Sequence, residues 1–236
     1  MIPKRKICVL TGAGISAESG IKTFRDADGL WEGHDIMEVA SPIGFNKNPN
    51  LVLDFYNQRR SQLREVKPNT AHHDLARMEV EFDVTIITQN VDDLHERAGS
   101  KNIIHLHGEL TKAVSCGDED YIIECNGDIT PKDQCPQGFQ MRPFIVWFGE
   151  EVPMLPVAIK EIEKCDAIMI IGTSMQVYPA ASLTAYAPVD THIFYIDPKP
   201  NVNYELSLSN RLKIFKGPAT IETKNAIQTL KNLYCM

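Results

Sequence analysis

The sequence contains no long run of apolar residues, no internal repeat and no low-complexity tract. The first absence argues against a transmembrane segment, and residues 1–6 lack the apolar core of a signal peptide. We therefore expect a cytoplasmic protein with no membrane partner. The six cysteines are scattered along the 236 residues, which argues against a disulfide framework.

The chain also lacks an excess of positive charge. It has 24 Lys and Arg residues against 31 Asp and Glu, a formal net charge of −7, which argues against a nucleic-acid partner bound through phosphate contacts. Apolar residues make up 43% of the sequence, enough for an ordinary globular core. The length fits one domain, or a large domain that carries a smaller module.

Short apolar runs alternate with amphipathic segments along most of the chain. We expect strands at residues 6–11, 83–88, 102–106, 167–172, 192–197 and 212–216. Helices are expected at residues 50–63, 70–82, 91–98, 153–164 and 220–234. Nearly continuous apolar strands with helices between them are typical of a parallel sheet buried on both faces. The pattern predicts an α/β fold, with a Rossmann-like parallel sheet and helices on both faces.

Two segments, residues 32–68 and 111–142, interrupt this alternation. The first contains no convincing strand, and the second holds three of the six cysteines and several turn-forming pairs. We interpret both as insertions that form a smaller domain, a helical segment packed with an irregular module. Residues 1–31, 69–110 and 143–236 would then make up the nucleotide-binding domain.

A glycine-rich turn follows the first predicted strand. Gly12, Ala13 and Gly14, with Ala17 as the third small residue, have the G-x-G-x-x-G/A spacing of a dinucleotide fingerprint. A second such turn, Gly172-Thr173-Ser174, follows the strand expected at 167–172. Glycine-rich turns also serve purely structural purposes, but two of them could hold opposite halves of one dinucleotide.

Polar side chains end several of the other predicted strands. They are Gln89, Asn90 and Asp92, then His107, and then Asp197. Ligands of open α/β sheets bind beyond the carboxyl ends of the strands, so these side chains should converge there. Asn90 or Asp92 could instead cap the next helix. His107 is a candidate general base, whereas a metal site at His105 and His107 lacks a clear third ligand.

Seven separated motifs, taken together, resemble those of the sirtuins. In order they are Gly-Ala-Gly-Ile-Ser-Ala-Glu-Ser-Gly-Ile (12–21), Thr-Phe-Arg (23–25), Gly-Leu-Trp (29–31), Thr-Gln-Asn-Val-Asp (88–92), His-Gly-Glu (107–109), Phe-Gly-Glu (148–150) and Gly-Thr-Ser-Met-Gln-Val-Tyr-Pro-Ala-Ala (172–181). The resemblance runs in order from residue 7 to about 181, with a weaker tail. It implies an enzyme that consumes NAD while removing an acyl group from lysine, releasing nicotinamide and O-acyl-ADP-ribose.

The same resemblance assigns roles to residues. The two glycine turns would bind NAD, Phe24 and Arg25 would belong to a cofactor loop, and Asp197 would lie near the adenine ribose. Gln89, Asn90 and Asp92 would hold the other ribose and the carboxamide, while His107 would accept a proton from a ribose hydroxyl. His107, Asn90 and Asp92 are therefore the predicted catalytic residues.

The resemblance also predicts how substrates bind. Five residues would pair with the backbone of an acylated peptide: Phe148, Gly149, Glu150, Val177 and Tyr178. Tyr56 and Arg59 match the Tyr-x-x-Arg pair of the desuccinylase-like branch, which removes succinyl, malonyl or glutaryl groups and whose bacterial members often remove acetyl groups too. Residues three apart share a helix face, so both could address one acyl carboxylate. The local alternative is a basic, solvated helix face.

The sequence departs from the sirtuin pattern at the zinc module. The family usually has two Cys-x-x-Cys pairs, but Cys116 and Cys135 each lack the second cysteine, and Cys125 is wrongly spaced for a pair. We therefore predict no metal site and a module held by its apolar side chains. We also expect a monomer. Mono-ADP-ribosyl transfer or NAD hydrolysis would use the same pocket, and a non-catalytic NAD sensor is the remaining alternative.

Overall fold

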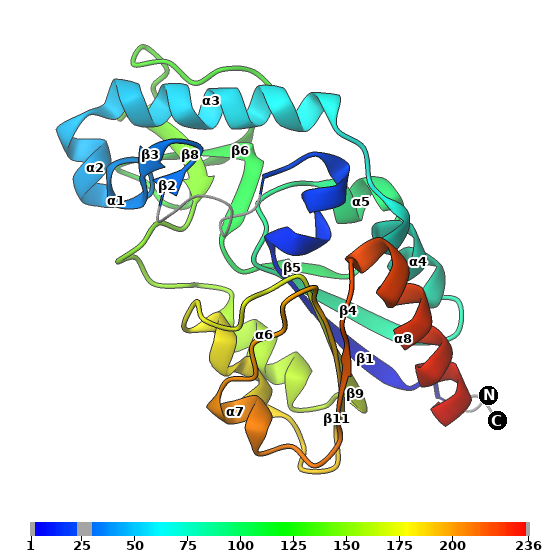
Figure 1. The fold of residues 1–236 in the computed structure, drawn as a ribbon. Helices are drawn as coiled ribbons and strands as arrows, with labels where there is room; N and C mark the ends of the chain where they lie inside the picture. The colour runs from blue at the N-terminus through cyan, green and yellow to red at the C-terminus, as the bar shows by residue number, and fades with distance from the viewer. Residues whose placement is uncertain (1–2, 23–29, 235–236) are drawn as a thin grey trace.

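The computed structural model describes residues 3–22 and 30–234, and a six-stranded parallel sheet forms its centre (Figure 1). The strand order is β11-β10-β9-β1-β4-β5. The strands are β1 (Lys6–Thr11), β4 (Asp83–Thr88), β5 (Ile103–His105), β9 (Ala167–Ile171), β10 (His192–Ile196) and β11 (Leu212–Phe215). The predicted α/β fold is confirmed, and all six predicted strands are present, four of them one or two residues shorter than expected.

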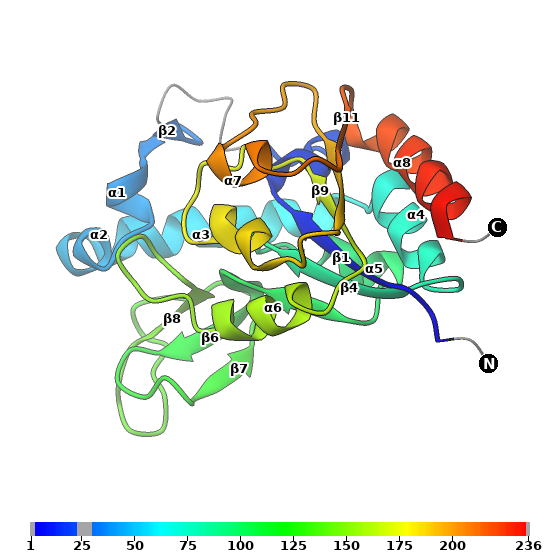
Figure 2. The same ribbon diagram turned by 90° about the horizontal axis from the view of Figure 1, so that it is seen from below.

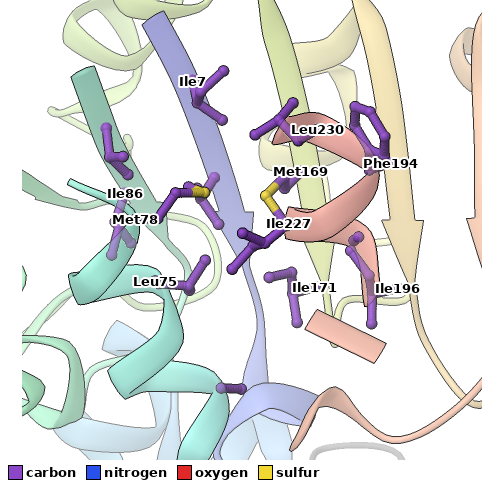
Figure 3. Close-up of a cluster of buried hydrophobic side chains, with 14 of the residues drawn as sticks. Ile7, Leu75, Met78, Ile86, Met169, Ile171, Phe194, Ile196, Ile227 and Leu230 are labelled. Atoms are coloured by element: carbon purple, nitrogen blue, oxygen red, sulfur yellow. The ribbon is translucent and has the colours of Figure 1, made fainter. Parts of the chain in front are cut away.

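Helices cover both faces of this sheet. On one face, α4 (Thr70–Met78) and α8 (Ala219–Tyr234) pack against the side chains drawn in Figure 3, where Leu75 and Leu230 lie among the isoleucines of the strands. On the other face, α6 (Leu155–Ile162), the 3-10 helix Ala180–Tyr186 and α7 (Tyr204–Ser207) cover a second apolar cluster. The carboxyl ends of the strands therefore remain the open edge of the sheet.

The remaining elements form a smaller group beside the sheet. It contains α1 (Ile36–Val39), α2 (Pro42–Lys47), the long α3 (Pro49–Glu65) and an antiparallel sheet in the order β7-β6-β8. Its strands are β6 (Gly108–Ser115), β7 (Ile122–Glu124) and β8 (Met141–Ile145). Both insertions contribute to one apolar cluster, in which Phe55 of α3 and Met141 of β8 are buried. Figures 1 and 2 show α3 lying along β6 and β8.

Polar side chains cap the start of α3, which lines the cleft described below, and the start of α4. Asn48 accepts a hydrogen bond from the Leu51 N–H at the start of α3, and Pro49 fills the first turn. Asn69 accepts a bond from the Ala71 N–H at the start of α4. The Asn69 amide also donates to the Ile15 carbonyl, at 2.7 Å. The segment after the first glycine turn is thereby tied to α4.

Several expectations need correction. The segment 32–68 does contain a strand, because β3 (His34–Asp35) pairs with β2 (Leu30–Trp31). Helix α5 (Leu94–Ala98) begins three residues later than predicted, α4 ends at Met78 rather than residue 82, and α6 is shorter than residues 153–164. The strand expected at residues 102–106 is followed almost directly by a further strand that was not predicted, because Gly108 and Glu109 begin β6. Of the apolar set expected to hold the module, Ile122, Ile123 and Phe139 are exposed.

None of the helices in the described ranges combines the length and the apolar character that crossing a bilayer requires.

Candidate active site

One cleft of about 590 Å³ collects the predicted site residues. Its walls come from the carboxyl ends of β1, β4, β9 and β10, from α3 and from the segment after β8. Phe24 and Arg25 lie outside the described residues. All of the other predicted residues line the cleft: Gly12, Ala13, Gly14, Ala17, Tyr56, Arg59, Gln89, Asn90, Asp92, His107, Phe148, Gly149, Glu150, Gly172, Thr173, Ser174, Val177, Tyr178 and Asp197.

The two glycine turns touch each other at the floor of the cleft. The Gly14 N–H donates to the Gly172 carbonyl at 2.8 Å, and the Gly12 N–H donates to the Ile171 carbonyl at 3.1 Å. A Cβ on Gly14 would lie 2.6 Å from Gly172 Cα, and Gly172 has a φ of +63°. The small residues are therefore needed for the contact between the two turns. The dinucleotide fingerprint explains them only by the approach of a ligand.

Asn90 and Asp92 are nearly buried beneath the first turn. Asn90 Nδ2 donates to the Gly12 carbonyl at 3.2 Å, and Ser16 Oγ donates to Asp92 Oδ2 at 2.9 Å. Asp92 Oδ1 accepts from the Leu94 N–H at 3.1 Å, so Asp92 also caps the start of α5, whereas Asn90 does not. The capping and functional interpretations of Asp92 are thus compatible.

The environment of Asp92 changes its titration. The residue is 7% exposed, and burial raises the pKa of its carboxyl group to about 6, although the hydrogen bonds from Leu94 and Ser16 oppose the shift. The carboxylate is therefore ionised at neutral pH at a cost in folding free energy. A buried, destabilised charge of this kind in a cleft is typical of a functional site.

His107 is oriented by the strand beside it. Its Nδ1 lies 3.0 Å from the Gln89 carbonyl oxygen, which can only accept, so Nδ1 carries the hydrogen and Nε2 carries the lone pair. Nε2 has no hydrogen-bond partner in the described part of the chain, and the ring lines the cleft. Burial lowers the pKa of His107, and the bond to the Gln89 carbonyl only partly opposes this. The ring is therefore neutral at pH 7 and able to accept a proton.

The second glycine turn is held by neighbouring polar side chains. Gln89 Nε2 donates to Thr173 Oγ1 at 3.0 Å, and the Tyr195 hydroxyl donates to the Thr173 carbonyl at 2.9 Å. Asp197, at the end of β10, is 2% exposed and accepts from the Lys199 N–H at 2.8 Å. The residues predicted for the adenine half of a dinucleotide thus share one edge of the cleft with the turn.

Tyr56 and Arg59 come from consecutive turns of α3. Tyr56 is fully buried, and its hydroxyl accepts from Trp147 Nε1 at 3.0 Å, which leaves its own hydrogen to donate. Burial raises the pKa of Tyr56, so the hydroxyl stays protonated. Arg59 Cζ lies 4.7 Å from the centre of the Phe55 ring, and Arg59 Nε and Nη1 are buried with no hydrogen-bond partner among the described residues. This pair supplies donors that lack an acceptor.

The solvated-face interpretation of α3 is wrong for the next residue. Arg60 is 1% exposed; its Nε donates to the Leu110 carbonyl at 2.9 Å, and its Nη1 donates to Asn57 Oδ1 at 2.8 Å. Asn57 in turn exchanges two hydrogen bonds of 2.9 Å with the backbone of Ile129. The polar side of α3 therefore anchors the second insertion.

The residues predicted to pair with a peptide form the mouth of the cleft. The Phe148 N–H donates to the Ala40 carbonyl at 2.9 Å, and Gly149 has a φ of +94°. Glu150 is held by Arg142 at 3.0 Å and by the Trp147 N–H at 2.8 Å. Across the mouth, Tyr178 is 58% exposed, beside Val177. Both edges are accessible to an extended chain.

Sequence reasoning missed several residues that line or support the cleft. Ser16 lies inside the first sirtuin motif, and its bond to Asp92 could not be foreseen from spacing. Trp147 directly precedes the Phe-Gly-Glu motif, and this position could have indicated a cleft residue. It donates to the hydroxyl of Tyr56. Lys22 and Glu32 also line the cleft, joined by an ion pair of 3.0 Å, and no motif pointed to them.

The described residues contain no group of three or more His, Cys, Asp or Glu side chains placed to hold a metal ion. His105 is instead paired with Glu96 at 2.7 Å. Burial lowers the pKa of His105, but the hydrogen bond and charge of Glu96, the charge of Glu109 and the bond to the Asn90 carbonyl together outweigh this, and the net shift is upward. Cys116 is exposed, while Cys135 is buried in the apolar cluster.

A doubly wound parallel sheet with two glycine turns at its carboxyl edge, closing one cleft with a buried acid and a neutral histidine, defines a dinucleotide-binding enzyme. The model of the Sir2 family matches residues 12–179, and the chain belongs to this family.

Relatives and solved structures agree. The chain is 60% identical over 195 residues to an NAD-dependent protein deacylase of Helicobacter pylori (strain ATCC 700392 / 26695), covering 83% of this chain and 85% of that one. It is 47% identical over 236 residues to the NAD-dependent protein deacylase of Vibrio vulnificus (strain YJ016), covering 97% and 94%. A mutant Sir2 homologue–ADP ribose complex superposes with a TM-score of 0.87 at 36% identity, covering 99% and 94%.

Proposed function

We propose that the cleft catalyses NAD-dependent removal of acyl groups from lysine side chains of proteins, and that acidic acyl groups are among its substrates together with acetyl. The reaction class is that of the Sir2 family and of the curated relatives. The observation that supports the acidic acyl groups is the donor pair on α3. Arg59 presents two buried nitrogens without partners among the described residues, and the protonated hydroxyl of Tyr56 belongs to the same cleft wall.

The cleft fits a dinucleotide. Two glycine turns in contact form its floor, the buried Asp197 lies at one end, and Asn90 and Asp92 lie under the other turn. The solved neighbours include a Sir2 homolog–NAD complex, to which the chain is 36% identical. NAD, when bound, supplies an electrophilic ribose carbon and nicotinamide as the leaving group.

The residues of this chain would then orient the reactants and move one proton. Asn90 and Asp92 would hold the reacting ribose and the carboxamide, and Gln89 would fix the turn beneath them. His107, with its hydrogen on Nδ1, would accept a proton at Nε2 from a ribose hydroxyl. The apolar wall formed by Val91, Ile145 and Trp147 would exclude water from the acyl group.

The substrate would enter at the mouth of the cleft. An extended peptide would pair with residues 148–150 on one side and 177–178 on the other, a backbone-directed mode that tolerates many sequences. A solved neighbour with a TM-score of 0.77 is a Sir2 mutant–peptide–NAD complex. The acyl group would extend along the apolar wall toward α3, where Tyr56 and Arg59 would bind a terminal carboxylate.

We further propose that residues 111–142 fold without zinc. The cysteine pairs are incomplete, and α3 anchors this segment through side chain-to-backbone bonds. Asn57 binds Ile129, and Arg64 Nη1 donates to the Asn126 carbonyl at 2.7 Å, while Arg60 binds Leu110 directly before the segment.

The test of the acyl assignment compares one peptide in acetylated and succinylated form. Arg59→Met should lower kcat/KM for succinyl-lysine by about 100-fold, because a buried carboxylate loses its charged partner, and should change the value for acetyl-lysine by about threefold or less. Arg64→Met, on the same helix but exposed, is the matched control and should leave the ratio unchanged. Equal losses on both peptides in Arg59→Met would refute the assignment.

A further inference from the structure

The acyl end of the cleft contains a carboxylate of the protein itself. Glu32 lines the cleft with Arg59, and its side chain is only 13% exposed. Its backbone has a φ of +51°, an uncommon conformation for a residue other than glycine. Its carboxylate Oε2 lies 3.0 Å from Lys22 Nζ.

Aromatic packing places this carboxylate near Arg59. The ring of Trp31, directly before Glu32, lies 4.9 Å from the ring of Phe55 in an edge-on contact. The guanidinium of Arg59 lies over the same Phe55 ring, at 4.7 Å. Trp31 and the Arg59 side chain therefore contact the same aromatic ring, and Glu32 directly follows Trp31 in the chain. Burial lowers the pKa of Arg59, and among the described residues the carboxylate of Glu32 partly offsets this effect.

The charge of Arg59 is costly when the cleft holds no acyl group or holds an uncharged one. Arg59 has no hydrogen-bond acceptor among the described residues, and a buried guanidinium without a countercharge is costly. A carboxylate close by, but shared with the exposed Lys22, reduces that cost without saturating the donors of Arg59. An acidic acyl group that reaches Arg59 meets both the favourable guanidinium and the unfavourable Glu32.

We propose that Glu32 is a specificity-determining residue that broadens acyl selectivity: its carboxylate balances Arg59 when the acyl group is neutral and weakens the binding of an acidic acyl group. The inference rests on the proposed acyl role of Arg59. It explains how one cleft can accept acetyl-lysine beside a buried arginine. Lys22 moderates the effect by sharing the carboxylate of Glu32.

The experiment measures kcat and KM for acetyl- and succinyl-lysine versions of one peptide with wild type, Glu32→Gln, Arg59→Met and the control Glu163→Gln. Glutamine keeps the length of the side chain and tolerates the same backbone conformation. We expect Glu32→Gln to raise the succinyl-to-acetyl ratio of kcat/KM by roughly tenfold, the effect of removing one nearby charge in a partly screened cleft. The change should lie mainly in the KM for the succinylated peptide.

The control separates this effect from a change in overall charge. Glu163 is exposed, and Glu163→Gln removes the same charge as Glu32→Gln. The succinyl-to-acetyl ratio of kcat/KM in Glu163→Gln should therefore match that of wild type. An unchanged or lower ratio in Glu32→Gln, or an equal loss on both peptides, would overturn the inference even if Arg59→Met selectively loses the succinylated peptide. If Arg59→Met instead affects both peptides equally, the proposed acyl role fails first. Thermal unfolding of each variant establishes that it is folded.

Discussion

Replacing Asp92 by asparagine should stabilise the folded protein at neutral pH while it lowers activity. Asp92 is buried beneath the first glycine turn and accepts hydrogen bonds from Ser16 Oγ and the Leu94 N–H. Asparagine can keep both bonds, because its oxygen accepts from Leu94 and its amide can donate to the rotated Ser16 hydroxyl. The substitution therefore removes a buried charge without leaving either partner unpaired.

The size and sign of the effect follow from the titration of the carboxyl group. Its pKa rises from the ordinary value of 3.8 to about 6 in the fold, so the native state holds its proton more tightly than the unfolded state. Stability contributed by this group falls as pH rises from 3.8 to 6, and above pH 6 the ionised group costs about 3 kcal/mol. At pH 4.5 the same relation leaves a cost of about 1 kcal/mol.

Denaturant unfolding at pH 7.5 and pH 4.5 measures this difference directly. Asp92→Asn should be more stable than wild type by up to about 3 kcal/mol at pH 7.5 and by about 1 kcal/mol at pH 4.5. Asp93→Asn is the matched control, because Asp93 is half-buried at the surface, is paired with Arg97 at 3.3 Å, and should change stability by only about 0.5 kcal/mol. Deacylation by Asp92→Asn should fall by about tenfold or more. A variant that is less stable at pH 7.5, or a gain that does not depend on pH, would refute the reasoning.

Two further predictions concern the proton acceptor and the metal. His107→Tyr should lower deacylation by about 100-fold or more with far-UV circular dichroism unchanged, and wild-type turnover in that variant would overturn the base assignment. Because burial lowers the pKa of His107, the acid limb of kcat/KM in wild type should lie below pH 6.5, and a limb above that value would contradict it. Elemental analysis should find no stoichiometric zinc, and a chelator should leave the unfolding temperature unchanged; one zinc per chain would contradict this.

The main sheet could be predicted because its inner strands are buried on both faces. β1 and β9 are almost wholly apolar, and short runs of this kind between amphipathic helices are typical of central parallel strands. The antiparallel sheet could not be recognised in the same way. β6 alternates between buried and partly exposed positions and contains the ion pair of Glu109 and Lys112, while β8 contains Pro143. Such strands form only when they pack beside α3.

The site was more predictable than its supports. Residues in the motifs lie at strand ends, and the common edge of a parallel sheet brings them together. The residues that support the site are harder to predict, because some are charged side chains that a sequence pattern would place at the surface. Arg60 is charged and yet buried, because Leu110 and Asn57 accept its hydrogens. Nothing in the local pattern separates it from exposed neighbours such as Arg64 on the same helix.

The two ends of the cleft rest on different scaffolds. Touching loops of the sheet make the dinucleotide floor, whereas Tyr56 and Arg59 are carried by α3, which belongs to the neighbouring group of elements. Under the proposed acyl role of Tyr56 and Arg59, substitutions at these two positions of α3 would redirect the protein toward a longer or uncharged lysine modification. The glycine-to-glycine contact would be untouched by such changes, and the chemistry at the ribose would be inherited intact.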